Sequence, residues 1–291
     1  MSSDTKHQRM QQRLAERRQR LLAARELSPV AAVVRRYNAI DGSNQGVLIS
    51  VQLFTVVIPL MILGFAFVSG FAGDASPGTV WIRELGLIEP NSGHVRDAFG
   101  AAERLRSTWN FLGLAAFLVW GIPMSMTVAA MFAKAWQREQ FDRGQRLVRG
   151  ALWFVLYLTM MGLRVHIADG AEHSPATQIA LFAVTLIPMW IFWSLTPLVL
   201  VRDGGRGLKS IALAGLAGVV IDGIAIPVVS RLVFPPVIGS WTDFGPIGIA
   251  MALMAWCGLL GVGWVVTACT GAVMWERNAP TDTVIEAQTA D

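Results

Sequence analysis

The sequence predicts an all-α, polytopic membrane protein with six transmembrane helices and both termini in the cytoplasm. Of its 291 residues, 54% are apolar and only 15% are charged, whereas a soluble domain usually carries about 25% charged residues. The charged residues gather between long neutral blocks, and the basic ones are concentrated in alternate connections. These observations favour a helical bundle in a membrane over a soluble domain.

Six blocks are long and apolar enough to cross a bilayer, which takes roughly 20 residues. Backbone groups cannot stay unpaired in lipid, so each block is expected to be a helix. The predicted membrane domain is 46–277, and its blocks are 46–72, 108–136, 147–167, 179–201, 211–234 and 249–275.

The distribution of basic residues predicts the orientation. Residues 1–45 contain nine Lys and Arg, and the connections after the second and fourth blocks are also basic, whereas 168–178 and 235–248 contain none. By the positive-inside rule both termini are cytoplasmic. The segment 73–107 agrees less well, because it carries four arginines together with five acidic residues.

The segment before the first block, 1–45, is expected to be cytoplasmic or interfacial. Residues 5–27 have the pattern of a basic helix, which fits either a helix lying on an anionic leaflet or a charged tail that sets the topology. No aromatic residues interleave with its charges, which disfavours nucleic acid as a partner. Residues 29–41 predict a second, interfacial helix in which Tyr37 is a headgroup-level anchor.

Two further segments lie outside the blocks. Within 73–107 we expect two short amphipathic helices on the outer side, separated at "EPNSG". The tail 278–291 is polar and unpatterned, which predicts disorder. Of 24 basic residues only three are Lys, a bias typical of GC-rich bacterial genomes.

Enzyme signatures are absent from the sequence. The four histidines are scattered, and Cys257 and Cys269 are twelve residues apart in one block, about 18 Å along a helix and too far for a disulfide. Neither a phosphate-binding loop nor a nucleophile elbow is present. We therefore expect no catalytic residues, no metal and no cofactor.

Asp222 is the most informative residue, because it lies near the middle of the fifth block. A charge at that depth costs about 2.5–3.5 kcal/mol on insertion scales, and such residues usually face the interior of a bundle. At 100° per residue, Asp222 shares a helix face with small residues, which favours close packing against another helix. These residues are Ala214, Gly215, Gly218 and Ala225.

Arg164 in the third block is the expected partner of Asp222, with His166 beside it. Arg231 lies about 180° from Asp222 around the helix, so it is disfavoured. Two interpretations remain open. Asp222, Arg164 and His166 form a buried coupling or substrate site, or the arginines extend to the outer headgroups and Asp222 is structural.

The basic connections supply a second candidate site, a rim for anionic headgroups at the cytoplasmic side. Its residues are Arg143, Arg146, Arg202, Arg206 and Lys209. Four blocks also carry an Ile-Pro-apolar triplet, which fits either helix kinks or the inverted repeats of transporters.

Three stretches resemble the YihY/BrkB family of bacterial inner-membrane proteins, formerly labelled ribonuclease BN-like. They are "RRYNAIDGSNQGVLISVQLFTVVIPLMILG", "RDGGRGLKSIALAGLAGVVIDGIAIPVVSRLV" and "WTDFGPIGIAMALMAWCGLLGVGWVVTACTGAVMWER". The resemblance implies six helices with both ends inside and a connection with envelope lipid export. The ribonuclease label has no counterpart here, since no residues assemble the metals or acid–base pairs that RNA hydrolysis needs.

The leading functional hypothesis is a transporter or flippase-like exporter of an amphipathic, anionic envelope component, with anionic membrane lipids as its partners. The alternative is a non-transporting scaffold that binds envelope-synthesis proteins through its outer segment. Gly258, Gly261 and Gly263 allow close helix contact within one protomer or between protomers of an oligomer.

Overall fold

The computed structural model describes residues 28–68, 81–82, 85–103, 106–168 and 175–289. Every regular element in this part of the chain is a helix, and none of the described residues forms a strand. The elements are α2 (Pro29–Ala39), α3 (Gly42–Val68), α5 (Asn91–Glu103), α6 (Arg106–Ala135), α7 (Arg143–Ala168), α8 (Pro175–Leu200), α9 (Leu208–Gly218), η1 (Val219–Ala225), α10 (Ile226–Trp241), η2 (Thr242–Phe244), α11 (Pro246–Asn278) and α12 (Thr281–Thr289).

The long helices coincide with the six predicted blocks. Within the described residues, four of them are apolar and long enough to cross a membrane: α7, α8, the continuous α9–η1–α10 and α11. The other two blocks lie in α3 and α6, of 27 and 30 residues. The protein is therefore an all-α chain with several helices suited to a membrane.

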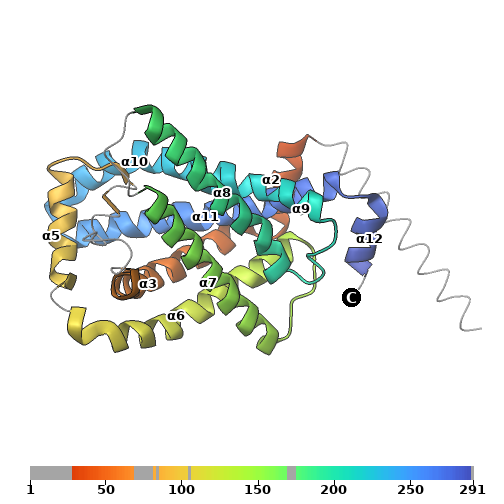
Figure 1. Ribbon diagram of the computed structural model, residues 1–291, viewed down its shortest axis with the longest axis horizontal. Coiled ribbons are helices and arrows are strands. Elements are labelled where there is room, and N and C mark those ends of the chain that lie inside the picture. The colour runs from red at the N-terminus through yellow and green to blue at the C-terminus, as the bar shows by residue number, and fades with distance from the viewer. Residues whose placement is uncertain (1–27, 69–80, 83–84, 104–105, 169–174, 290–291) are drawn as a thin grey trace, which may run out of the picture.

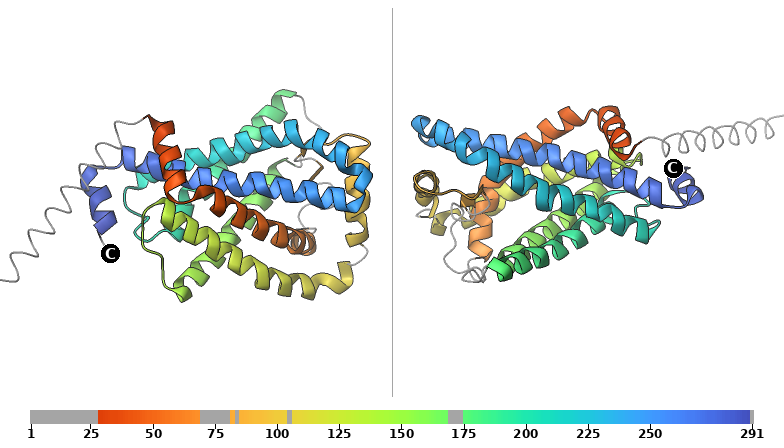
Figure 2. Two further views of the ribbon diagram at one scale, coloured as in Figure 1. Left: turned by 180° about the vertical axis from the view of Figure 1, so that it is seen from behind. Right: turned by 90° about the horizontal axis from the view of Figure 1, so that it is seen from above.

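Helix α11 is the centre of the bundle and packs against α2, α3, α6, α9 and α10. In Figure 2 it runs through the middle of the molecule with the other long helices around it. Its crossing with α3 is close because Gly261 has no side chain. A Cβ there would collide with Ser50 and with the carbonyl of Gly46.

The glycines of α11 therefore have distinct surroundings. A Cβ at Gly263 would meet Ile226 of α10, whereas Gly258 has nothing within 4 Å. Gly261 and Gly263 thus make close helix contacts within one protomer, which is one of the two possibilities that the sequence allows.

The connections divide between two ends of the bundle (Figure 1). One end holds α2, α12, the α6–α7 connection and the α8–α9 connection, and we call it the basic end. The other end holds α5 and the turn η2 between α10 and α11. The α6–α7 and α8–α9 connections, both rich in Lys and Arg, thus lie at one end, whereas α5 with Arg96 lies at the other.

Helix α2 confirms the second N-terminal helix. Ser28 caps it by accepting from the amide of Ala31, and a proline occupies the first turn, where its missing N–H is not needed. The predicted basic helix at 5–27 lies outside the described residues.

The outer segment is only partly described. Trp81, Leu85 and Val95 are buried, whereas Ile88 is 78% exposed. Helix α5 begins within the predicted break and is joined to α10 by the Asn91 amide, which donates to the carbonyl of Pro235 over 3.1 Å. The apolar side of this segment is thus used against the bundle.

The C-terminal tail differs from the prediction of disorder for 278–291, because residues Thr281–Thr289 form helix α12. Val284 is fully buried and Ile285 packs against the core. Two adjacent apolar side chains are too few for a periodic signal, yet they are enough to dock one short helix.

Candidate functional site

Asp222 lies in an unusual stretch of backbone. Its helix continues without interruption from α9 to α10, but the seven residues of η1 are π-helical. The amide of Ile226 donates to the carbonyl of Ile221, five residues back, instead of to the fourth. Such wide turns are rare and occur often at functional sites.

Pro227 accounts for the position of the wide turn. Proline has no N–H for the carbonyl four residues before it, which is that of Gly223, and its ring crowds that carbonyl. A wider turn relieves this crowding. Gly223 also fits closely, because a Cβ there would approach the sulfur of Met189 to 2.6 Å.

The small face that contains Asp222 packs against α8, as predicted. A Cβ at Gly215 would collide with Ser194, and one at Gly218 with the ring of Trp193. Ala225, assigned to the same face, is exposed. The extra residue in the π-helical turn rotates the following positions, which explains why this assignment fails only beyond Asp222.

Trp264 of α11 is a direct partner of Asp222. Its indole Nε1 donates to Oδ1 of the carboxylate over 3.3 Å. Asp222 is partly buried, while Trp264 is fully buried. A buried or membrane-embedded polar group is costly unless it is hydrogen-bonded, so this bond lowers the cost of placing the Asp222 carboxyl group in an apolar helix.

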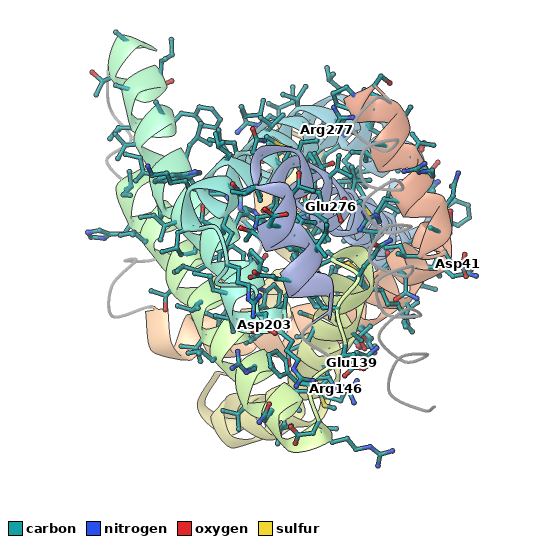
Figure 3. All side chains as sticks on the ribbon, turned by 90° about the vertical axis from the view of Figure 1, so that its right-hand side faces the viewer. Asp41, Glu139, Arg146, Asp203, Glu276 and Arg277 are labelled. Carbon is teal, nitrogen blue, oxygen red and sulfur yellow. The ribbon has the colours of Figure 1, made fainter. Side chains whose placement is uncertain are left out.

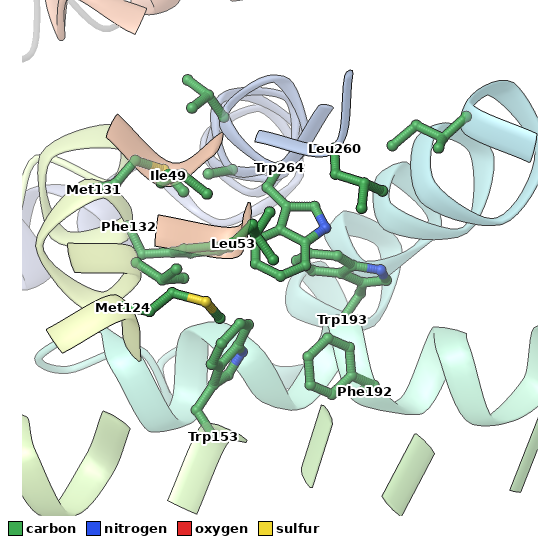
Figure 4. Close-up of a cluster of buried hydrophobic side chains, with 14 of the residues drawn as sticks. Ile49, Leu53, Met124, Met131, Phe132, Trp153, Phe192, Trp193, Leu260 and Trp264 are labelled. Atoms are coloured by element: carbon green, nitrogen blue, oxygen red, sulfur yellow. The ribbon is translucent and has the colours of Figure 1, made fainter. Parts of the chain in front are cut away.

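Trp264 belongs to an aromatic cluster that joins α7, α8 and α11. Its ring lies edge-on to those of Trp153, Tyr157 and Trp193, with centroids 5.5–6.4 Å apart. Figure 4 shows Trp264 above Trp153 and Trp193, with Phe192 beside them. Such edge-on pairs are favourable beyond their buried area, so the cluster fixes the indole that faces Asp222.

The structure does not join Arg164 to Asp222. Among the described residues Arg164 takes part in no ion pair, and its Nε is buried without a hydrogen-bond partner. His166 is exposed near the end of α7. Arg231 is also exposed, with its aliphatic part beside Gly86. No hydrogen bond or ion pair thus joins Asp222 to Arg164 or His166, the other two residues of the predicted coupling site.

The predicted headgroup rim lies at the basic end, and part of it pairs within the protein. Arg202 pairs with Glu139 at 3.3 Å, Arg206 pairs with Glu286 at 3.5 Å, and Arg146 donates to Gln140 over 2.6 Å. Arg143 and Lys209 are exposed, and within the described residues their side chains make no hydrogen bond or ion pair.

A buried ion pair lies beneath this rim and is not predictable from the local sequence. The guanidinium of Arg36 in α2 binds both carboxylate oxygens of Glu276 in α11, over 2.8 and 2.6 Å, and the carbonyl of Ala135 over 2.6 Å. The two side chains are only 11% and 9% exposed. Three helices are therefore fastened at one point.

Trp275 continues the same cluster, which we call the basic-end network: Arg36, Arg138, Arg206, Trp275 and Glu276. Its indole donates to the carbonyl of Arg206 over 2.9 Å, and the guanidinium of Arg138 lies 5.1 Å from the ring centroid. Figure 3 looks at this end and shows Glu276, Arg277, Asp203 and Arg146 facing the viewer. The sequence "WER" at 275–277 is a visible clue, but its partners are distant in the chain.

No metal centre is found within the described part of the chain, where no group of three His, Cys, Asp or Glu side chains could hold an ion. Cys257 and Cys269 are free thiols and both are buried.

Comparisons of the chain with family models, with curated proteins and with solved structures find no match.

Proposed function

We propose that the protein is a six-helix transporter of a bacterial inner membrane that moves an amphipathic, anionic envelope component. The supporting observation is the carboxylate of Asp222, held by Trp264 inside a π-helical turn halfway along an apolar helix. A carboxylate inside a membrane is by default a candidate for proton or substrate handling. In this proposal Asp222 changes protonation during transport.

The surroundings of Asp222 are consistent with movement. π-helical turns are among the places where helices kink, and they are frequent at functional sites, so this turn is a suitable position for a rearrangement of the helix. At the basic end, Arg143 and Lys209 are available to attract anionic headgroups, each basic side chain contributing about 1 kcal/mol near an anionic leaflet. Arg164, with its buried Nε, is the proposed counter-charge when the bundle rearranges.

Kinship with the YihY/BrkB family is part of this proposal and rests on the three stretches quoted above. The second stretch contains the π-helical turn and Asp222, and the third contains Trp264 and Glu276. The features that distinguish this structure thus fall inside the resembling segments.

The test is lipid movement in proteoliposomes that contain fluorescent anionic lipids, with and without a proton gradient. Wild-type protein is expected to move the lipid, and Asp222→Asn to lose most of the gradient-dependent movement while staying folded. Asp243→Asn is the matched control, because Asp243 is an exposed acid in η2. Equal movement by wild type and Asp222→Asn would exclude the coupling role.

The scaffold is the competing function, and the same preparation separates it. A scaffold moves no lipid and retains an envelope-synthesis protein on purification. Among the described residues of the outer segment, Trp81, Leu85 and Val95 are buried, whereas Ile88 is exposed and could contact such a partner.

Orientation is tested separately by labelling with an impermeant maleimide in intact cells. The native Cys257 and Cys269 are fully buried, so they do not interfere. Asp243→Cys is expected to react from outside and Lys209→Cys only after the membrane is opened. The reverse pattern would overturn the N-in/C-in arrangement.

A further inference from the structure

A groove lies between α2 and α11 at the basic end and encloses about 720 Å³, within the range of small-molecule sites in proteins. Its wall is mainly aliphatic, with Val30, Val33 and Val34 on α2 and Val266, Val273 and Met274 on α11. Val30 and Val34 are 73% and 52% exposed. An apolar hollow of this size needs an apolar occupant.

The groove resembles a phospholipid in length and in having a charged residue at one end of a mainly apolar wall. It follows α11 from Val266 to Asn278, which is about 18 Å at 1.5 Å per residue. One leaflet of the hydrocarbon core is about 15 Å thick, so the groove matches one acyl chain in length. Its charged residue, Arg277, and Asn278 are at the end of α11, whereas Val266 lies at the opposite limit along this helix. The lining also includes the hydroxyl side chains of Thr270 and Tyr37.

Charge favours an anionic headgroup at the polar limit. Arg36 is nearby in α2, but its charge is compensated by Glu276. Arg277 is the charged side chain that lines the groove itself. A guanidinium binds a phosphate through two parallel hydrogen bonds, which makes it suitable for this position.

We propose that the groove between α2 and α11 binds one acyl chain of an anionic phospholipid from the leaflet at the basic end, with its phosphate against Arg277. The site is separate from Asp222 and does not depend on transport. A lipid held there covers the exposed valines of α2.

The test uses full-length protein in phosphatidylcholine vesicles with a small fraction of a photoreactive lipid. Two probes carry the same diazirine-bearing acyl chain, one on phosphatidylglycerol and one on phosphatidylcholine. The phosphatidylglycerol probe is expected to label residues 29–39 and 266–274 about fivefold more than the phosphatidylcholine probe, the ratio for one basic contact. Leu152 and Val155 on α7 are exposed and report lipid that merely surrounds the protein.

Two variants with matched controls test the contacts. Val34→Trp fills the groove from an exposed position and is expected to reduce labelling of 29–39 to the level of α7, whereas Leu213→Trp on α9 leaves it unchanged. Arg277→Gln is expected to abolish the preference for phosphatidylglycerol, whereas Lys134→Gln at the same end retains it.

Three results would overturn the proposal. Equal labelling of α2 and α7 by both probes shows only surrounding lipid. A preference that survives Arg277→Gln places the headgroup elsewhere. If α7 is labelled while 29–39 and 266–274 are not, the groove is covered by protein and not by lipid. The covering protein would then be residues 1–27 or a second copy of the chain.

Discussion

The indole Nε1 of Trp264 and the Oδ1 of Asp222 are 3.3 Å apart, in a hydrogen bond between α11 and the π-helical turn of the neighbouring helix. This bond connects the candidate coupling residue to an aromatic cluster that spans three helices. The indole is therefore both a packing element and the donor that stabilises the carboxylate.

Trp264→Phe is expected to separate these two roles. Phenylalanine keeps an aromatic ring in the cluster but removes the donor, so lipid movement should fall toward that of Asp222→Asn. The folded state should lose about 1–3 kcal/mol, because a partner of the carboxylate is gone. Proteoliposome transport and thermal unfolding in detergent measure both effects. Wild-type transport by this variant would show that the bond has no functional role.

Breaking the buried pair of Arg36 and Glu276 is expected to be strongly destabilising. Arg36→Met removes the guanidinium that binds the buried carboxylate of Glu276, at a cost of about 3–5 kcal/mol, and adding Glu276→Leu should recover much of that loss. Arg202→Gln is the control, because its pair with Glu139 is exposed and contributes about 0–1 kcal/mol. Thermal unfolding of the variants in detergent gives the order. A double variant no better than Arg36→Met would contradict this explanation.

Gly218→Ala is expected to destabilise the packing of α9 on α8. The added methyl group would collide with the ring of Trp193, and overpacking costs about 1–3 kcal/mol. Gly258→Ala is the matched control, because nothing lies within 4 Å of its Cβ position and alanine is the better helix former. Unfolding temperatures should fall for the first variant and stay equal or rise for the second. Equal unfolding temperatures of the two variants would show that Gly218 does not pack closely against Trp193.

Glu89 gives a prediction for pH. Its pKa lies below the ordinary value of 4.5, chiefly because the Ser92 side chain hydrogen-bonds the carboxylate, helped by the amide of Gly93. A lowered pKa means that its support for the start of α5 is complete above pH 4.5 and is lost as the pH falls through the lower value.

Ser92→Ala should therefore bring the pKa of Glu89 back toward 4.5, measured by NMR titration of its carboxyl carbon. Arg96→Gln should have a smaller effect, because that ion pair is 3.6 Å long and exposed. An unchanged pKa in Ser92→Ala would exclude the hydroxyl as the main cause.

Much of the fold could be predicted because hydropathy and helical periodicity are local properties. The six blocks, the helix at 29–39 and the inward direction of Asp222 all depend on residues within a few turns. The π-helical turn could not be predicted, because it depends on whether a backbone carbonyl accepts from the amide four or five residues ahead, and the sequence does not fix this choice. Helix α12 was missed because two apolar side chains, Val284 and Ile285, leave no periodic signal.

The candidate site was predictable only in part. Asp222 is conspicuous because a carboxylate in an apolar block is costly. Its donor could not be inferred, because any of several tryptophans in other blocks could approach it, and Arg164 was the more obvious choice by charge. The pair of Arg36 and Glu276 could not be predicted either, because its two residues are far apart in the sequence and neither differs visibly from the charged residues around it.

The separation of Arg36 and Glu276 along the chain has a consequence for biosynthesis. They are 240 residues apart, so α2 is made before the helix to which it is fastened exists. The N-terminal helix cannot reach its final position until the last long helix has left the ribosome and entered the bundle. Closure of this one ion pair therefore marks the arrival of α11 in the bundle, and a product truncated before residue 276 would leave Arg36 without its carboxylate.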